Sequence, residues 1–245
     1  MLTTLESSKR KTKPSVEPVL TNTLGSIVFV HGLTGHRDET WTATGADEPW
    51  PKSLLGKDIE RARIITYGYD ADVVHLTRPA GQNTVREHAQ NLVNDLASLR
   101  RDSRIVNRPI IFVAHSLGGL VCQDALLLCN NPSEDAQRGI LQSTRAIAFL
   151  GTPHAGADLA KFAAAVANIV ACSMVKRPNR KLLGALKRNS EILTHIKQDF
   201  HTMLQRRLKD PSGLHPIDLH AFVEEVPVAF LGCVRLRRIV SRAWA

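Results

Sequence analysis

The segment from Ile111 to Gly119, IFVAHSLGG, constrains the fold of this chain more than any other. A continuous apolar and β-branched run leads directly into Ser116, and an almost wholly apolar stretch, Leu117 to Cys129, follows without a linker. Such a run indicates a strand buried on both faces, and a helix that is apolar all round indicates a cover for a sheet. The serine is therefore predicted to lie in a sharp turn between a central strand and a packed helix.

Other runs of the same kind indicate a parallel α/β sheet. Buried strands are predicted at 26–30, 63–67, 109–114 and 146–150, and a more alternating one at 217–223. Between the second and third of these, Thr84-x-x-Glu87 is a capping box that opens a helix with apolar residues at helical spacing. Alternation of strand and helix predicts an α/β fold with parallel strands and crossover helices.

The chain divides into three parts by composition. Residues 1–20 form a polar leader without helical or strand periodicity, and we expect them to be disordered. Residues 21–234 form one α/β domain, in which about 155–208 is far longer than one crossover requires and is predicted to be an inserted helical cap. Residues 235–245 form a basic tail.

The net charge of +9 is concentrated in three segments. Residues 176–209 carry a net charge of +8, residues 235–245 carry +4 and residues 1–13 carry +3, so the remainder is negative. No pattern typical of nucleic-acid-binding domains accompanies them, so we expect no nucleic acid partner. Two interpretations of the cap stay open: it lies on an anionic membrane surface and opens a lipid pocket, or its charged face is solvated.

Two further features bear on compartment and cofactors. The N-terminus lacks the apolar segment of a secretory signal, and the longest apolar stretch, 162–175, is shorter than the roughly 20 residues of a spanning helix. We therefore expect an intracellular protein without a membrane span. The four cysteines form neither a C-x-x-C pair nor a metal-ligand spacing, so neither a metal nor an organic cofactor is predicted.

The turn at Ser116 has the features of a nucleophile elbow. Ala114 and Gly118 occupy the two flanking positions where only small residues fit, with Ala114 in place of the usual glycine. The helix that begins here directs free N–H groups and the positive end of its dipole toward charge that develops at the serine. The N–H of Leu117 is therefore the first predicted oxyanion donor.

The end of the first strand supplies a second predicted donor. In His31-Gly32-Leu33, glycine lets the backbone turn over the sheet edge, and the N–H of Leu33 is the candidate. Around these two turns we predict a set of elbow and pocket residues: His31, Gly32, His115, Gly118 and Gly119.

Four stretches carry a resemblance to a known family. SIVFVHGLTGHRDETW, ARIITYGYDAD, RPIIFVAHSLGGLVCQDALL and TRAIAFLGTPHAGADL resemble the serine esterase and lipase-like family of α/β hydrolases, which includes serine-active-site proteins and fungal lipase-like proteins. The resemblance implies hydrolysis of carboxylic esters, above all lipids, by proteins associated with membranes of the mitochondrion or endoplasmic reticulum. It also implies that the parent chain can carry further domains.

The resemblance leaves the general base open. In the family, the catalytic histidine follows the last strand. In this chain no histidine follows His220, and the tail at 235–245 shows no similarity to the family. The last strand and histidine loop are therefore expected to be missing, as in a C-terminally truncated product, and the triad to be incomplete. His154, at the end of the fourth strand, is expected to shape the pocket or to act as a substitute base.

Glu224 is the predicted acid of the triad, because Phe222-Val-Glu224 matches a carboxylate of the family at the end of a strand. Asp70 is a second choice. Two functions therefore stay open: a serine hydrolase acting on lipid or other esters through Ser116, or a catalytically weak α/β-hydrolase domain that serves membrane recruitment or partner binding.

Overall fold

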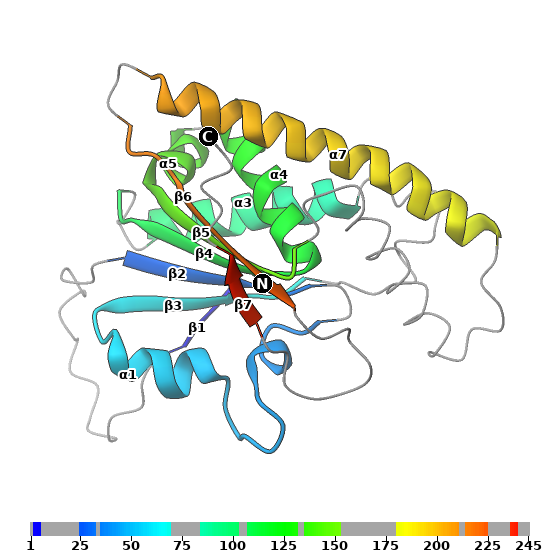
Figure 1. Cartoon of the computed structure of the whole chain (residues 1–245). Coiled ribbons are helices and arrows are strands. Elements are labelled where there is room, and N and C mark those ends of the chain that lie inside the picture. The colour runs from blue at the N-terminus through cyan, green and yellow to red at the C-terminus, as the bar shows by residue number, and fades with distance from the viewer. Residues whose placement is uncertain are drawn as a thin grey trace.

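A single β-sheet forms the centre of the protein. The computed structural model describes residues 2–5, 25–32, 35–69, 84–102, 107–131, 135–152, 180–210, 214–224 and 236–239. Within these ranges seven strands pair in the order β1-β3-β2-β4-β5-β6-β7 (Figure 1). Their bounds are β1 Leu2–Leu5, β2 Gly25–Val30, β3 Ala62–Tyr67, β4 Ile110–His115, β5 Thr144–Leu150, β6 Asp218–Glu224 and β7 Leu236–Ile239.

The inner part of the sheet is parallel, as the sequence predicts. Strands β3, β2, β4, β5 and β6 pair in parallel, and their bounds lie close to the five predicted runs. The two edge strands, β1 and β7, pair antiparallel with β3 and β6. Because all the parallel strands point the same way, the segments that follow them meet along one edge of the sheet.

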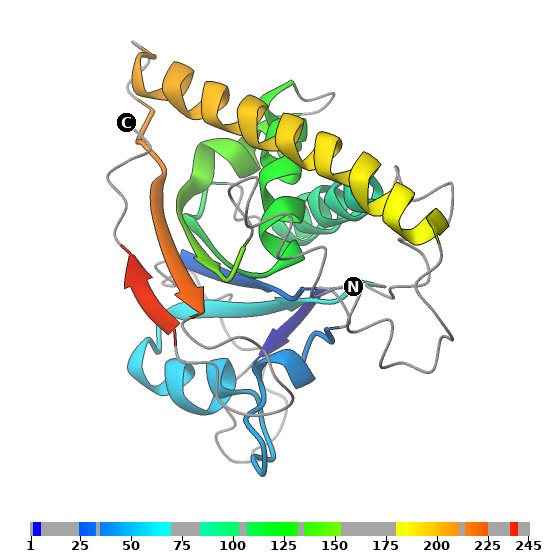
Figure 2. The same ribbon diagram turned by 45° about the vertical axis from the view of Figure 1, so that its right-hand side comes forward.

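Helices cover both faces of this sheet. On one face lie α3 (Thr84–Asp102), α4 (Leu117–Asn130), α5 (Asp135–Ser143) and α7 (Arg180–Leu208), as Figures 1 and 2 show. The opposite face of β2 and β3 is covered by the short helices η1 (Glu39–Trp41), η2 (Pro51–Leu55) and α1 (Gly56–Asp58). No described helix is long and apolar enough to cross a bilayer.

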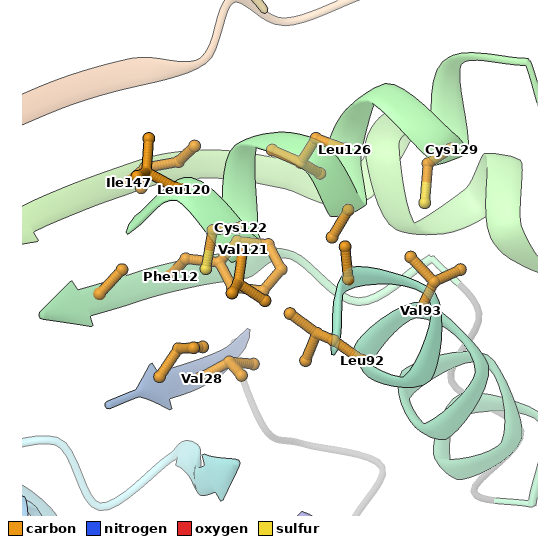
Figure 3. Packing of buried hydrophobic residues seen from close by; sticks show 14 of the residues in the cluster. Val28, Leu92, Val93, Phe112, Leu120, Val121, Cys122, Leu126, Cys129 and Ile147 are labelled. Atoms are coloured by element: carbon orange, nitrogen blue, oxygen red, sulfur yellow. The ribbon is translucent and has the colours of Figure 1, made fainter. Parts of the chain in front are cut away.

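The main core lies between the sheet and α4. Phe112 of β4 and Ile147 of β5 point toward Leu120 and Val121 of α4, and Leu92 of α3 completes the contact (Figure 3). All five side chains are almost fully buried. This packing explains why α4 is apolar nearly all round, and it fixes the N-terminus of that helix against the end of β4.

The two ends of the chain differ from expectation. Leu2–Leu5 lie in the leader predicted to be disordered, yet they form β1, paired with Ile64–Tyr67 of β3. Leu236–Ile239 lie in the tail predicted to lack the last strand, yet they form β7, paired with Ala221–Glu224. In both cases an edge strand of the sheet offers unpaired backbone groups, and these override a local sequence without strand periodicity.

The C-terminal half of α7 is not part of a separate cap. Leu193, Ile196 and Phe200 are buried in the main core, and the helix packs along α4 (Figure 2). The prediction of an inserted cap through residue 208 was therefore wrong for this half, which serves as the crossover between β5 and β6. Residues 153–179, the first part of the predicted cap, lie outside the described residues.

Arg207 anchors the end of α7 to its neighbours. Its guanidinium donates to three backbone carbonyl oxygens: His215 at 2.8 Å, Leu141 at 2.7 Å and Thr144 at 3.3 Å. Burial lowers the pKa of this side chain, and the nearby Arg145 acts in the same direction. The bonds tie the helix to α5 and to the start of β5.

The role of α7 can be tested by a core truncation. Phe200→Ala should lower the free energy of unfolding by about 3–5 kcal/mol, because the ring is fully buried and its removal leaves a cavity. Urea unfolding followed by circular dichroism measures the change. Leu208→Ala on the same helix is the control, since Leu208 is 57% exposed. Equal effects of the two substitutions would show that α7 is not a core helix.

Candidate active site

Ser116 lies at a sharp turn between β4 and α4. Its backbone angles are φ 52° and ψ −123°, and it is the only non-glycine residue with a positive φ in the described part of the chain. Such a conformation costs on the order of 1–3 kcal/mol and persists only where the surroundings enforce it. Here the Ser116 N–H donates to the Leu150 carbonyl oxygen at 2.8 Å, and the Ser116 carbonyl accepts the Gly119 N–H at 3.1 Å.

The elbow is pressed against the end of β2. A Cβ atom added to Gly32 would lie 2.7 Å from the Cβ of Ser116. A Cβ atom added to Gly118 would lie 2.3 Å from the carbonyl oxygen of His31 and 2.6 Å from that of Val30. The contacting atoms around Gly118 are backbone atoms of a strand and its extension, so they cannot rotate away. Glycine is therefore required on both sides of this contact.

Gly119 is equally confined on the other side of the elbow. A Cβ there would lie 2.2 Å from the hydroxyl oxygen of Thr152, which follows β5. The Thr152 hydroxyl is buried without a hydrogen-bond partner in the structure, and the sequence analysis did not single it out. The predicted glycines at 32, 118 and 119 are thus brought together around Ser116 by three neighbouring strand ends.

Leu117, the first predicted oxyanion donor, follows Ser116 directly. Leu117 is the first residue of α4, and the first N–H groups of a helix have no acceptor within the helix. The helix dipole adds positive potential at the same place. The side chain of Ser116 makes no capping hydrogen bond to this turn, and it is half-buried. Leu33, the second predicted donor, lies outside the described residues.

His31 is held neutral beside the elbow. It is 1% exposed, its Nδ1 lies 2.9 Å from the Gly32 carbonyl oxygen, and its Nε2 accepts the Tyr69 backbone N–H at 3.3 Å. Burial lowers its pKa, while the contact with the Gly32 carbonyl acts in the opposite direction. Because both ring nitrogens are engaged by backbone groups, His31 is not available as a base for Ser116.

Two other histidines, the predicted pocket residue His115 and the strand residue His220, have defined positions. His115 directly precedes Ser116, and its half-buried ring lies edge-on to Trp41 with centroids 6.5 Å apart. His220 lies in β6, the strand next to β5, and pairs with Ala148. It lies before the carboxyl end of its strand. His154, the predicted pocket residue or substitute base, lies outside the described residues. The base therefore stays unassigned.

Glu224 is the last residue of β6, at the same carboxyl edge of the sheet as Ser116. Strands β4, β5 and β6 are successive neighbours, so the two backbones are separated by about 10 Å, twice the spacing between strands. The structure describes only the backbone of Glu224, and Asp70 lies outside the described residues. The topology thus places Glu224 at the predicted edge, and its role stays a prediction.

A groove of about 560 Å³ lies away from the elbow, between α3, α4 and α7. Arg86 and Asp124 line it and form an ion pair at 2.5 Å. Burial raises the pKa of Asp124, while Arg86 acts against this effect. The lining residues include none of the predicted site residues, so the groove is separate from the candidate active site.

Comparison with known proteins decides the family. The model of the alpha/beta hydrolase family matches residues 27–242, which include the elbow, most of β2, the other four parallel strands and β7. This chain belongs to the alpha/beta hydrolase family. The match extends into the tail that we had predicted to lie outside the family. Membership supports a hydrolase in general, and it leaves the substrate open.

The chain matches only part of the length of its curated relatives. The chain is 29% identical to Protein SERAC1 of Bos taurus over 176 residues, which are 66% of this chain and 26% of that protein. It is 27% identical to Protein SERAC1 of Danio rerio over 191 residues, 71% of this chain and 28% of that protein. The chain therefore spans about a quarter of the length of these relatives.

Solved structures show more distant similarity. The Bacillus licheniformis lipase BlEst2 in mature form is 20% identical, with a TM-score of 0.44 over 81% of this chain and 68% of that one. BpoC of Mycobacterium tuberculosis H37Rv is 17% identical, with a TM-score of 0.36 over 74% of this chain and 66% of that one.

The contact at Gly118 can be tested by adding one methyl group. Gly118→Ala should lower the free energy of unfolding by about 1–3 kcal/mol or more, because the new Cβ meets backbone oxygens that cannot move independently. Gly56→Ala is the matched control, since its Cβ would meet its nearest neighbours only at 3.7 Å. Thermal or urea unfolding measures both. Tolerance of alanine at 118 would contradict the close approach of α4 and β2.

The neutral state of His31 predicts a pH dependence of stability. As the pH falls below 6.5, His31 takes up a proton in the unfolded chain but not in the folded one, because its folded pKa is lowered. Stability conferred by this group is therefore present above about pH 6.5 and lost as the pH falls toward the folded pKa. His31→Gln should weaken this loss in urea titrations at pH 5 to 8, whereas His215→Gln, at an exposed histidine, should not.

Proposed function

We propose that this chain is a serine hydrolase that acts on carboxylic esters, with Ser116 as nucleophile. The observation that carries the proposal is the strained backbone of Ser116 at the N-terminus of α4. A positive φ at a non-glycine residue is costly, and here it places a half-buried serine beside the first free amides of a helix. That combination suits attack on a carbonyl carbon next to a site that stabilises negative charge.

The proposed reaction follows from these positions. Ser116 Oγ attacks the acyl carbon of the ester while its proton passes to a histidine, and the carbonyl oxygen becomes an oxyanion. The N–H groups of Leu117 and Leu33 would hold that oxyanion. The alkoxide then leaves and takes the proton, and water hydrolyses the acyl-serine with the same histidine as base.

The remaining roles rest on the resemblance described above. His154 is the proposed pocket residue or base, and Glu224 is the proposed acid that orients the histidine. Lipid esters are the proposed substrates, and an anionic membrane of the mitochondrion or endoplasmic reticulum is the proposed location. No metal or organic cofactor is required by the chemistry proposed.

One observation favours a second candidate function. No histidine follows His220 in this sequence, although the resemblance places the base after the last strand. Without a base at that position a serine reacts slowly, since triads that lack a member lose several orders of magnitude in rate. The alternative is a catalytically weak α/β-hydrolase domain that recruits a membrane or a partner.

Active-site labelling tests the proposal. A fluorophosphonate probe should label the native chain and should not label Ser116→Ala, because only an activated serine displaces fluoride from phosphorus. Turnover of a p-nitrophenyl ester should fall to background in the same variant. Ser53→Ala is the matched control, since Ser53 is another half-buried serine, hydrogen-bonded to the Pro49 carbonyl.

The outcomes separate the two functions. Labelling and turnover that both depend on Ser116 support the hydrolase. Absence of both from the correctly folded native chain overturns it and favours the recruitment domain. Labelling that survives in Ser116→Ala would place the reactive group elsewhere and would also contradict the proposal.

A further inference from the structure

His31 and Tyr69 interact through three separate contacts. Their rings are stacked, with centroids 4.3 Å apart and planes inclined by 6°. The Tyr69 hydroxyl donates to the His31 carbonyl oxygen at 2.8 Å, and the Tyr69 backbone N–H donates to His31 Nε2 at 3.3 Å. The two residues follow the adjacent parallel strands β2 and β3, so the contacts join two neighbouring strand ends.

These contacts define the state of the histidine. A backbone N–H can only donate, so Nε2 must be an unprotonated acceptor. In a neutral imidazole the proton then resides on Nδ1, which faces the Gly32 carbonyl oxygen at 2.9 Å. One tautomer thus satisfies both ring nitrogens. Protonation of Nε2 would place its N–H opposite the Tyr69 N–H, so that two hydrogen-bond donors would face each other.

The backbone fixed in this way forms one wall of the elbow. The His31 carbonyl that accepts the Tyr69 hydroxyl also faces Gly118, and Gly32 lies against the Cβ of Ser116. The Gly32 carbonyl in turn accepts the Gly35 N–H at 3.1 Å. The peptide from His31 to Gly32 is therefore held between Tyr69 on one side and the elbow on the other.

We propose that Tyr69 is a positioning residue: it locks His31 in its Nδ1–H form and thereby fixes the His31–Gly32 backbone that lies against Ser116. Its effect on rate rests on the proposed serine chemistry, whereas its effect on the backbone does not. Tyr69 acts through His31 and Gly32 and does not itself touch the reacting atoms.

The chemistry of the hydroxyl suits this role. Burial raises the pKa of Tyr69 well above its ordinary value, so the group stays a hydrogen-bond donor throughout the physiological range. Phenylalanine would preserve the stack and the backbone N–H contact, and would remove only the bond to the His31 carbonyl. Substitution by phenylalanine therefore isolates that bond.

The neighbouring Tyr67 provides a matched control. Tyr67 is buried, and its hydroxyl donates to the His88 carbonyl at 3.3 Å, on α3 rather than at the elbow. Tyr67→Phe and Tyr69→Phe each remove one hydroxyl from nearby tyrosines at the end of β3. Only Tyr69→Phe removes a bond to the β2 turn.

The first experiment measures rate. Tyr69→Phe should slow fluorophosphonate labelling of Ser116 and lower kcat for a p-nitrophenyl ester by about tenfold, with little change in KM, because the loss falls on transition-state positioning. Tyr67→Phe should leave both rates near those of the native chain at a similar unfolding midpoint. Equal rate losses in the two variants, or a change in KM alone, would overturn the proposal.

The second experiment is independent of activity. In the native chain, ¹H–¹⁵N spectra of the imidazole groups should show His31 with a protonated Nδ1 and a free Nε2 at neutral pH. Hydrogen exchange of the Gly35 amide should be about tenfold faster in Tyr69→Phe and unchanged in Tyr67→Phe. A protonated Nε2, or unchanged exchange, overturns the positioning role. Failure of labelling in the native chain would instead count against the proposed function alone.

Discussion

The close approach of two backbones governs this structure. The first turn of α4 lies so near the end of β2 that a single Cβ at Gly118 would meet the carbonyl oxygens of Val30 and His31 at 2.6 and 2.3 Å. Glycine makes this contact compatible with the chain, and the contact in turn places Ser116 beside the turn that follows β2. If α4 moved outward by the width of a methyl group, the serine would lose its neighbours on β2.

The same helix links the site to the stability of the whole domain. Its N-terminus carries the strained Ser116, and its length packs between the sheet, α3 and α7 with almost every apolar side chain buried. The packing supplies the free energy that holds the serine at a positive φ. Core substitutions in α4 or α7 are therefore expected to affect the elbow as well as the overall stability.

Sequence patterns predicted the centre of the fold better than its borders. The five parallel strands, α3 and α4 were predictable because burial on both faces of a sheet leaves continuous apolar runs. Strands β1 and β7 were not, since Leu2–Leu5 and Leu236–Ile239 are short and are stabilised by pairing with an edge rather than by their own composition. The pairing of Tyr69 with His31 was also missed, although both residues lie just beyond predicted strands, because stacking between side chains leaves no periodic signal.

The sequence alone determined the elbow: a buried run, a small residue on each side of Ser116 and an apolar helix allow few other arrangements. Only the tertiary structure decided which residues surround it. It placed Gly32 from the end of β2 against the Cβ of Ser116 and Thr152 from the end of β5 against Gly119, engaged both nitrogens of His31, and made the C-terminal half of α7 part of the core. Local steric requirements depend on consecutive residues and can be read from the sequence. Contacts between distant strand ends depend on the register and order of the strands in the sheet.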